Sequence, residues 1–500
     1  MNFSMKMSQA YFFNSDKSFD QKAGIFVHHH GSSINPTVNM SNYQQYINNE
    51  LDLVESMGYQ NIETPFTHVT NYDSEFVTII QYLVDQALSR DITVMLIAQG
   101  TQDNTMSTAE IKSDSQNYLQ VMTKFIIRNA GKGLVYEGIN EPDSGDWYGL
   151  NTVTGYQQAI IWDNQLKAAI NEYDSSATFV EAVLYPAYGL PMIKQGLINP
   201  SAYAMHPYIK NIGNKGSNVP ETQLLNATYP TSYQGKKFAM TEFGIASEYE
   251  GKDNEDDWQG IVSADEAAAL TVRQMIIQDA LGAPMQYNFM LGYLYVFKKY
   301  QFFDLNANIT ATGTAVKNAL KELQGYYFRA WVWADVGTHH SYIAKYINKD
   351  GLTKYAYWNA DGSSADIVVG TNTLHATSAV QYTIVNLAAS VNTLVIQTPA
   401  GLKTIDVKQL SVGKPVLLQL PTVIGYQHNE VTATLDGTGK LTLHADIVYR
   451  RSDEHGLQVD ANKLTNGFDN LMLKSPDGTS WKAVVASGNI SWVKNQGNVI

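Results

Sequence analysis

Over residues 20–325 the sequence alternates short apolar runs with longer segments of helical periodicity, and this alternation constrains the fold more than any other feature. The expected strands are 23–27, 59–64, 92–98, 134–139, 178–184, 202–205, 238–241 and 285–290. The expected helices are 42–57, 74–89, 113–129, 155–173, 263–281 and 314–323. Strands and helices that alternate at this spacing favour a parallel sheet, and eight strands favour closure into a barrel. We therefore predict a (β/α)8 barrel over residues 1–325.

The pattern changes after Gly325. From Trp331 to Tyr449 the segments are short, alternate polar with apolar residues and are rich in Val, Thr, Ile and Tyr, with turns such as Asp361-Gly362 between them. This pattern predicts a β-sandwich over residues 326–450. Residues 451–500 are more polar, and the Ser-Pro-Asp-Gly sequence at 475–478 is typical of a hairpin turn, which predicts a small β-rich C-terminal segment.

Composition excludes several classes of protein. With 44% hydrophobic and 16% charged residues, the chain is globular rather than disordered. It has no cysteine, so disulfides, thiolate metal sites and a cysteine nucleophile are ruled out. No apolar run is long enough to span a bilayer, and a net charge of −13 disfavours a phosphate backbone as ligand. We expect neither membrane insertion nor a nucleic-acid partner, and the composition predicts no particular oligomeric state.

The N-terminal segment bears on where the protein acts. Residues 1–22 are polar throughout and lack the apolar stretch of a secretory signal peptide. We therefore expect a cytoplasmic protein, or one that becomes virion-associated or extracellular after cell lysis.

Two acidic motifs end expected strands. The first, at 135–143, contains Glu141, and the second, at 238–244, contains Glu242. The active site of an α/β barrel lies at the carboxyl ends of its strands, so both glutamates should face the mouth of the barrel. A glutamate at the end of an apolar strand is costly unless it is paired or functional. Two carboxyl groups across the mouth are the pair that glycoside hydrolysis requires.

The two motifs also carry a family resemblance. Asn-Glu-Pro at 140–142 and Thr-Glu-Phe-Gly at 241–244 resemble the corresponding motifs of the clan A retaining glycoside hydrolases, the four-seven superfamily. The resemblance implies that Glu141 is the acid/base, that Glu242 is the nucleophile and that Asn140 binds the sugar 2-hydroxyl group. Met-His-Pro-Tyr at 205–208 is similar too, and implies a place near the nucleophile or substrate for His206 and Tyr208, although His206 is equally compatible with a core histidine. No cofactor is implied.

One position departs from that family. Clan A enzymes usually carry an arginine near the end of strand two, close to the nucleophile, and here the residue is Glu63. A third carboxyl group near Glu141 and Glu242 would raise the pKa of at least one of them by like-charge repulsion. We expect Glu63 to lie in the catalytic mouth, where it bonds a sugar hydroxyl group or tunes the acid/base.

Other candidates carry weaker signals. Trp147, just past the acid/base, and Tyr287, on the eighth strand, are either platforms for a sugar ring or ordinary packing residues. His28 and His30 would share a face of the first strand, but no further ligand has a suitable spacing, so we expect no metal site.

Taken together, these features predict a retaining β-glycoside hydrolase that acts on a polysaccharide or oligosaccharide. The alternative is a non-catalytic glycan-binding protein of a virion or cell surface that uses a glycosidase-like barrel. The segment 471–482 resembles β-hairpin segments of bacteriophage structural proteins, and this resemblance implies a phage depolymerase of capsule or exopolysaccharide. Sugar, linkage and endo or exo action are left open, because they depend on the loops of the barrel.

Overall fold

The structure of the chain is a computed structural model. It describes residues 17–27, 39–67, 69–98, 108–141, 153–184, 202–210, 212, 219–225, 232–233, 236–248, 259–292, 297–336, 340–369, 372–385 and 387, and thereafter the strands 393–398, 401–406, 416–419, 430–435, 441–445, 472–474, 480–486 and 489–494. Trp147, His28 and His30 lie outside the described residues, as does most of the N-terminal segment.

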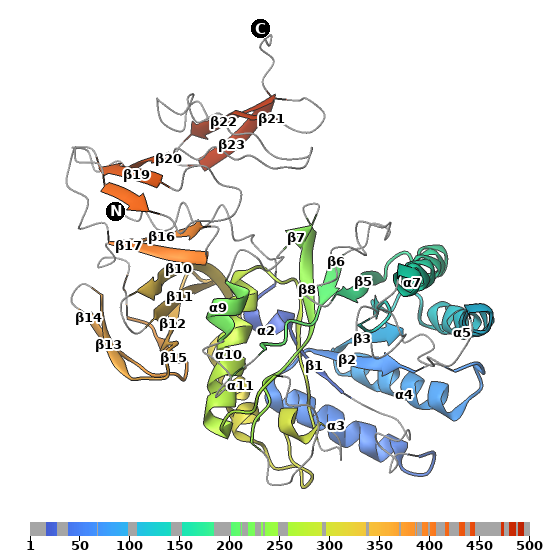
Figure 1. Ribbon diagram of the computed structural model, residues 1–500. Coiled ribbons are helices and arrows are strands. Elements are labelled where there is room, and N and C mark those ends of the chain that lie inside the picture. Colours follow the sequence, from blue (N-terminus) through green and yellow to red (C-terminus); the bar gives the residue numbers. More distant parts are fainter. Residues whose placement is uncertain are drawn as a thin grey trace.

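Eight parallel strands close into a barrel, as the alternation predicted (Figure 1). In chain order they are β1 (Ala23–Phe26), β2 (Asn61–Phe66), β3 (Thr93–Ala98), β4 (Val135–Glu137), β5 (Thr178–Leu184), β6 (Ala202–Met205), β8 (Lys236–Phe243) and β9 (Gln286–Asn288). β1 pairs with both β2 and β9, and β6 pairs with both β5 and β8, so the ring of strands is complete. The short strand β7 (Ser232–Tyr233) pairs antiparallel with β8 outside this ring.

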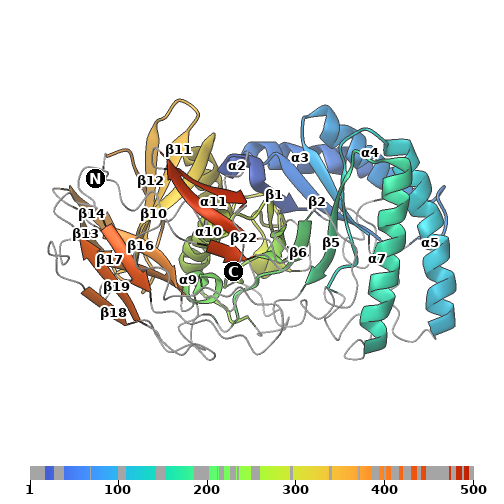
Figure 2. The same ribbon diagram turned by 90° about the horizontal axis from the view of Figure 1, so that it is seen from above.

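Helices follow the strands and cover the outside of the barrel (Figures 1 and 2). They are α3 (Tyr43–Met57), α4 (Glu75–Ser89), α5 (Thr108–Asn129), α7 (Val153–Tyr173), α9 (Pro220–Leu224), α10 (Ala264–Ala280) and α11 (Ala311–Glu322), with the short α2 (Phe19–Lys22) before β1. Side-chain caps start several of them: Ser74 accepts from the Val77 amide and Ser263 from that of Glu266, the latter at the start that its Ser-x-x-Glu sequence indicates. Among the described helices, none combines the length and apolarity needed to cross a bilayer.

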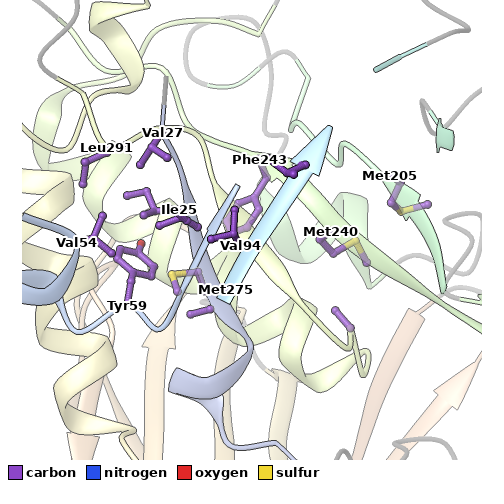
Figure 3. Close-up of a cluster of buried hydrophobic side chains, with 14 of the residues drawn as sticks. Ile25, Val27, Val54, Tyr59, Val94, Met205, Met240, Phe243, Met275 and Leu291 are labelled. Carbon is purple, nitrogen blue, oxygen red and sulfur yellow. The ribbon is translucent and has the colours of Figure 1, made fainter. Parts of the chain in front are cut away.

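The main core lies between the strands and the surrounding helices. Figure 3 shows part of it, where Ile25 and Val94 of the barrel strands lie near Val54 of α3 and Met275 of α10. A second, smaller cluster fills the barrel itself with one side chain from each of six strands: Met95, Val135, Val180, Ala204, Ala239 and Tyr287. The barrel is therefore a packed core that is closed below its mouth, not a channel.

Antiparallel sheets follow the barrel. The first contains β10 (Tyr326–Val336), β11 (Ser341–Asn348), β12 (Thr353–Asn359) and β15 (Gln381–Thr383), and β13 (Ala365–Val369) pairs with β14 (Asn372–Ala376). Ile343 and Tyr355 of the first sheet share a buried cluster with Ile367 and Leu374 of the second, as in a sandwich. The remaining strands are β16 (Thr393–Thr398), β17 (Gly401–Asp406), β18 (Val416–Gln419), β19 (Glu430–Leu435), β20 (Leu441–Ala445), β21 (Met472–Lys474), β22 (Ser480–Ala486) and β23 (Asn489–Lys494). The predicted domain limits at 325 and 450 stay predictions.

A buried polar network joins the first antiparallel sheet to the barrel. Arg273 of α10 donates two hydrogen bonds, of 2.7 and 2.6 Å, to the Glu221 carboxylate of α9. The indole Nε1 of Trp358, on β12, donates to the same carboxylate at 2.6 Å. Trp331 and Trp358 also belong to the main core of the barrel. The sheet is therefore packed against the helices α9 and α10 rather than tethered loosely (Figure 1).

Candidate active site

Glu141 and Glu242 lie at the carboxyl ends of β4 and β8, two strands that are not adjacent in the barrel. Glu242 is the second-last residue of β8, and Glu141 lies four residues after the end of β4. Their side chains are 21% and 13% exposed, so both are accessible from the mouth of the barrel. Glu141 has a φ of 42°, a left-handed conformation that costs a residue other than glycine about 1–3 kcal/mol and is concentrated at functional sites.

His206, which follows β6, lies between the two carboxylates. Its Nδ1 is 2.6 Å from Glu141 Oε1 and 3.8 Å from Glu242 Oε2, and the ring is fully buried. Burial alone would lower the pKa of His206, but the Glu242 and Glu141 carboxylates outweigh it and raise the pKa to about 9. At neutral pH the ring is therefore an imidazolium, and the two carboxylates, not contact with water, stabilise its charge.

These three residues also have the composition of a metal site. One ligand atom from each of Glu141, His206 and Glu242 lies within 4.8 Å of the others. A protonated imidazole, however, carries hydrogen on both nitrogens and has no lone pair for a metal ion. In its protonated form His206 therefore pairs with the two carboxylates, and it could bind a metal ion only after losing a proton.

Tyr208 completes the surroundings of Glu242. Its hydroxyl group donates a hydrogen bond to Glu242 Oε1, and its ring packs edge-on against Tyr300 at 6.0 Å. Burial raises the pKa of Glu242 to about 7, while the His206 charge and the Tyr208 hydrogen bond favour its ionised form. The two groups thus keep a buried carboxylate available near neutral pH.

A second layer of carboxyl groups lies beneath the first. Glu63 of β2 and Glu137 of β4 are both fully buried, and Glu137 Oε1 accepts a hydrogen bond of 2.9 Å from Thr241, next to Glu242. Asp163 of α7, also buried, accepts from the Ile139 amide at 3.0 Å and so supports the segment between β4 and Glu141. Burial raises the pKa of Asp163 to about 8.

Comparisons with known proteins support the fold. No family model matches the sequence, and no curated protein matches it. Among solved structures, a family 39 glycoside hydrolase from the gut symbiont Bacteroides cellulosilyticus WH2 is similar with a TM-score of 0.51 and 13% identity, over 74% of this chain and 81% of that one. The chain therefore shares the (β/α)8 barrel fold of that enzyme. A family 39 β-xylosidase from Caulobacter crescentus matches with a TM-score of 0.42 and 14% identity, over 69% of this chain and 78% of that one.

Two of the candidate substrate contacts, Tyr287 and Glu63, lie inside the barrel, and for Tyr287 this is the packing alternative. Tyr287 is 1% exposed and fills the barrel interior, so its ring offers no face on which a sugar could stack. A Cβ on Gly24 would lie 2.3 Å from that ring, so the glycine makes room for it. Glu63, fully buried in the layer below the mouth, has no surface open to a sugar hydroxyl group. Its predicted effect on the ionisation of the site remains a prediction.

Among the described residues, Asn140 and Tyr208 lie beside the two glutamates. Asn140 is half-buried beside Glu141, and Tyr208 is 8% exposed against Glu242. Sequence reasoning missed Glu137, Asp163 and Tyr300. Glu137 was detectable, because it lies within the apolar strand that precedes Glu141, where a carboxyl group is costly unless it is paired or functional. Neither Asp163 nor Tyr300 carries such a signal.

Proposed function

We propose that the chain is a retaining β-glycoside hydrolase that acts on a polysaccharide or oligosaccharide. The observation that carries the proposal is the separation of the two carboxyl groups: one oxygen of Glu141 and one of Glu242 lie within 4.8 Å of each other. Retaining glycosidases separate their carboxyl groups by about 5–5.5 Å, and inverting ones by about 6.5–9.5 Å to admit a water molecule. The short distance favours direct attack by a carboxylate.

The roles follow from what each glutamate contacts. Glu242, close to an imidazolium and bonded by Tyr208, is held ready as an anion, which suits attack on the anomeric carbon. Glu141 delivers a proton to the glycosidic oxygen as the bond between that oxygen and the anomeric carbon breaks. In the second step Glu141 takes a proton from water, whose oxygen displaces Glu242 and releases the sugar with its configuration retained.

The test is release of reducing ends from a panel of purified polysaccharides that includes bacterial capsules and exopolysaccharides, the substrates expected of a depolymerase. We expect the native chain to cleave at least one of them and Glu242→Gln to cleave none. On an aryl glycoside of the responding sugar, Glu141→Ala should stall as the glycosyl-enzyme, and azide should rescue it to give a β-glycosyl azide. Binding of a polysaccharide without cleavage by the native chain would support the glycan-binding alternative instead, and an α-azide would contradict retention.

A further inference from the structure

Glu63 and Glu137 are carboxyl groups that lie inside the barrel without enough hydrogen-bond donors. Both side chains are fully buried, and both oxygens of Glu63 and Oε2 of Glu137 have no hydrogen-bond partner among the described residues. Two ionised carboxylates have no hydrogen to share, so a hydrogen bond between these two groups requires one proton. Among the described residues, no N–H or O–H group is bonded to either oxygen of Glu63, so nothing else compensates a charge on it. A buried, uncompensated carboxylate is strongly disfavoured.

The barrel geometry explains why the two groups meet. β2 and β4 are alternate strands, and inward side chains from alternate strands of such a barrel form one layer. Met95 of the intervening β3 is in register with Glu63, and Ile97 with Glu137. The pair therefore lies inside the barrel, directly below the strand ends that carry the candidate catalytic residues.

One hydrogen bond connects this layer to the nucleophile strand. Thr241 Oγ1 donates to Glu137 Oε1 at 2.9 Å, and Thr241 is itself fully buried. Thr241 directly precedes Glu242 on β8. The hydrogen bond to Glu137 therefore helps to fix the position of the backbone that carries Glu242. Glu137 can accept from Thr241 and from Glu63 together only while it is the ionised member of the pair.

We infer that Glu63 is a positioning residue: its neutral carboxyl group donates a hydrogen bond to the Glu137 carboxylate, which in turn holds Thr241 and the strand that carries Glu242. A proton on Glu63 thus occupies the place at which clan A enzymes usually carry an arginine. The effect on catalysis rests on the function proposed for Glu242, whereas the proton and the strand contact do not.

The charges around the pair agree with this assignment. Burial and the neighbouring Glu137 and Glu242 raise the pKa of Glu63 well above its ordinary value. Burial raises the pKa of Glu137 too, but a bond from Glu63 favours its ionised form. The titratable groups that face the pair are Glu242 of β8 and Tyr287 of β9 on the Glu63 side, and His206, Glu141 and Asp163 on the Glu137 side.

The proton itself is tested by the pH dependence of unfolding. Folded protein keeps the Glu63 proton above pH 5, but an unfolded glutamate, with a pKa of about 4.3, has lost it. Folding then takes up a proton, so stability falls as the pH rises until the pair deprotonates. In Glu63→Gln an amide donates the same bond without a titrating proton. Relative to this variant, the unfolding equilibrium constant of the native chain should rise by up to about tenfold per pH unit above pH 5.

Infrared spectroscopy gives a second readout of the proton. A neutral carboxyl carbonyl band should be present in the native chain at pH 7 and weaker in Glu63→Gln. The shared proton would be refuted if the stability of the native chain and that of Glu63→Gln changed equally with pH and the carbonyl band were the same in both. Stability that responds to a chelator rather than to pH would also overturn it, because a bound cation would then occupy the place of the proton.

The positioning role is tested on β8 itself. Glu63→Leu removes the donor, so amide hydrogen exchange across Lys236–Phe243 should quicken at least tenfold, while exchange in β11 stays as in the native chain. Glu63→Gln should keep slow exchange. Thr241→Val cuts the same connection, so Glu63→Leu combined with Thr241→Val should exchange no faster than the quicker single variant. If Glu63→Leu fails to fold, the Gln and Val variants still decide the matter.

Kinetics separate this inference from the proposed function. On a cleaved substrate, Glu63→Leu should lower kcat at least tenfold with KM unchanged, since Glu63 has no surface open to a sugar. The positioning role would be refuted if Glu63→Leu had the same kcat as the native chain or the same amide exchange rates in β8. If the native chain cleaves no polysaccharide, the unfolding, infrared and exchange results stand on their own, and only the proposed function fails.

Discussion

The hydroxyl group of Tyr208 controls the ionisation of Glu242, and removing it should move the acid side of the pH–rate profile. Burial raises the pKa of Glu242 to about 7, and the Tyr208 hydrogen bond is one of the two interactions that hold it from rising further. A hydrogen bond to a charged group contributes about 1.5–3 kcal/mol. One pKa unit corresponds to about 1.4 kcal/mol, so Tyr208→Phe should raise the pKa of Glu242 by about 1–2 units.

The ionised fraction of Glu242 determines the sign and the size of the effect on the rate. In the proposed mechanism Glu242 attacks as an anion, so activity should be lost as the pH falls through the pKa of Glu242. With a pKa near 7, about half of the native protein is ionised at pH 7, against about a tenth to a hundredth of Tyr208→Phe. At pH 7 the kcat/KM of the variant should therefore be about 5- to 50-fold below that of the native chain. The two values should converge by pH 9 to 10, where Glu242 is mostly ionised in both proteins.

The assay is kcat/KM from pH 5 to 10 on a substrate that the native chain cleaves. Tyr118→Phe is a matched control, because the Tyr118 hydroxyl group is also buried and donates, at 2.5 Å, to the Phe66 carbonyl away from the carboxylates. That control should alter stability without moving the profile. If the Tyr208→Phe profile keeps its acid midpoint and is lowered equally at every pH, the hydroxyl group acts in the transition state and the reasoning about Glu242 is wrong.

Three further predictions concern stability, measured as urea-induced unfolding. Arg273→Met leaves the Glu221 charge buried without its ion-pair partner and should cost about 3–5 kcal/mol, whereas adding Glu221→Gln should restore part of the loss; an additive double variant would contradict this. Gly24→Ala places a methyl group against the Tyr287 ring and should cost about 1–3 kcal/mol, relieved by Tyr287→Leu but not by Tyr287→Phe. A chain that ends at Gly325 exposes core on the barrel helices and should lose cooperative unfolding, which a sharp transition would refute.

The strands and helices of the barrel were predictable because the spacing of apolar residues along the sequence differs between strands and helices. Apolar runs gave all eight strands, and helical spacing gave the larger helices, with errors concentrated at the ends. Helix α11 begins at Ala311, three residues before its predicted start, because the Thr310 side chain accepts from the Gly313 amide and caps an earlier turn. Strand β4 ends at Glu137, two residues before its predicted end, where the chain turns toward Glu141.

The mouth of the barrel was more predictable than its interior. Strand ends identify which residues face the mouth, so Glu141, Glu242 and His206 could be placed from the order of the strands alone. Every residue of β2 is buried, however, and a strand buried on both faces shows no alternation that tells inward from outward side chains. For that reason the sequence could not show that Glu63 lies below the mouth. The residues of β9 are likewise all buried, so the sequence could not show that Tyr287 fills the core.

The balance of protons in the site predicts a narrow pH range for activity. Glu63, Glu137, Glu141 and Glu242 lie in or beneath the mouth, and His206 is the cation that acts on three of them. With all four carboxyl groups ionised and His206 protonated, the net charge would be −3, in a site whose members are mostly buried.

Each proton removes part of that charge. The one inferred on Glu63 reduces it to −2, and the one that Glu141 must hold before it can donate reduces it to −1. An arginine on strand two would have offset charge without depending on pH, but this chain has a titrating group there. Activity should therefore fall on the alkaline side as the proton on Glu63 leaves, as well as below pH 7 where Glu242 becomes neutral. A kcat/KM profile that stays flat from pH 8 to beyond pH 10 would show that the site does not depend on retained protons.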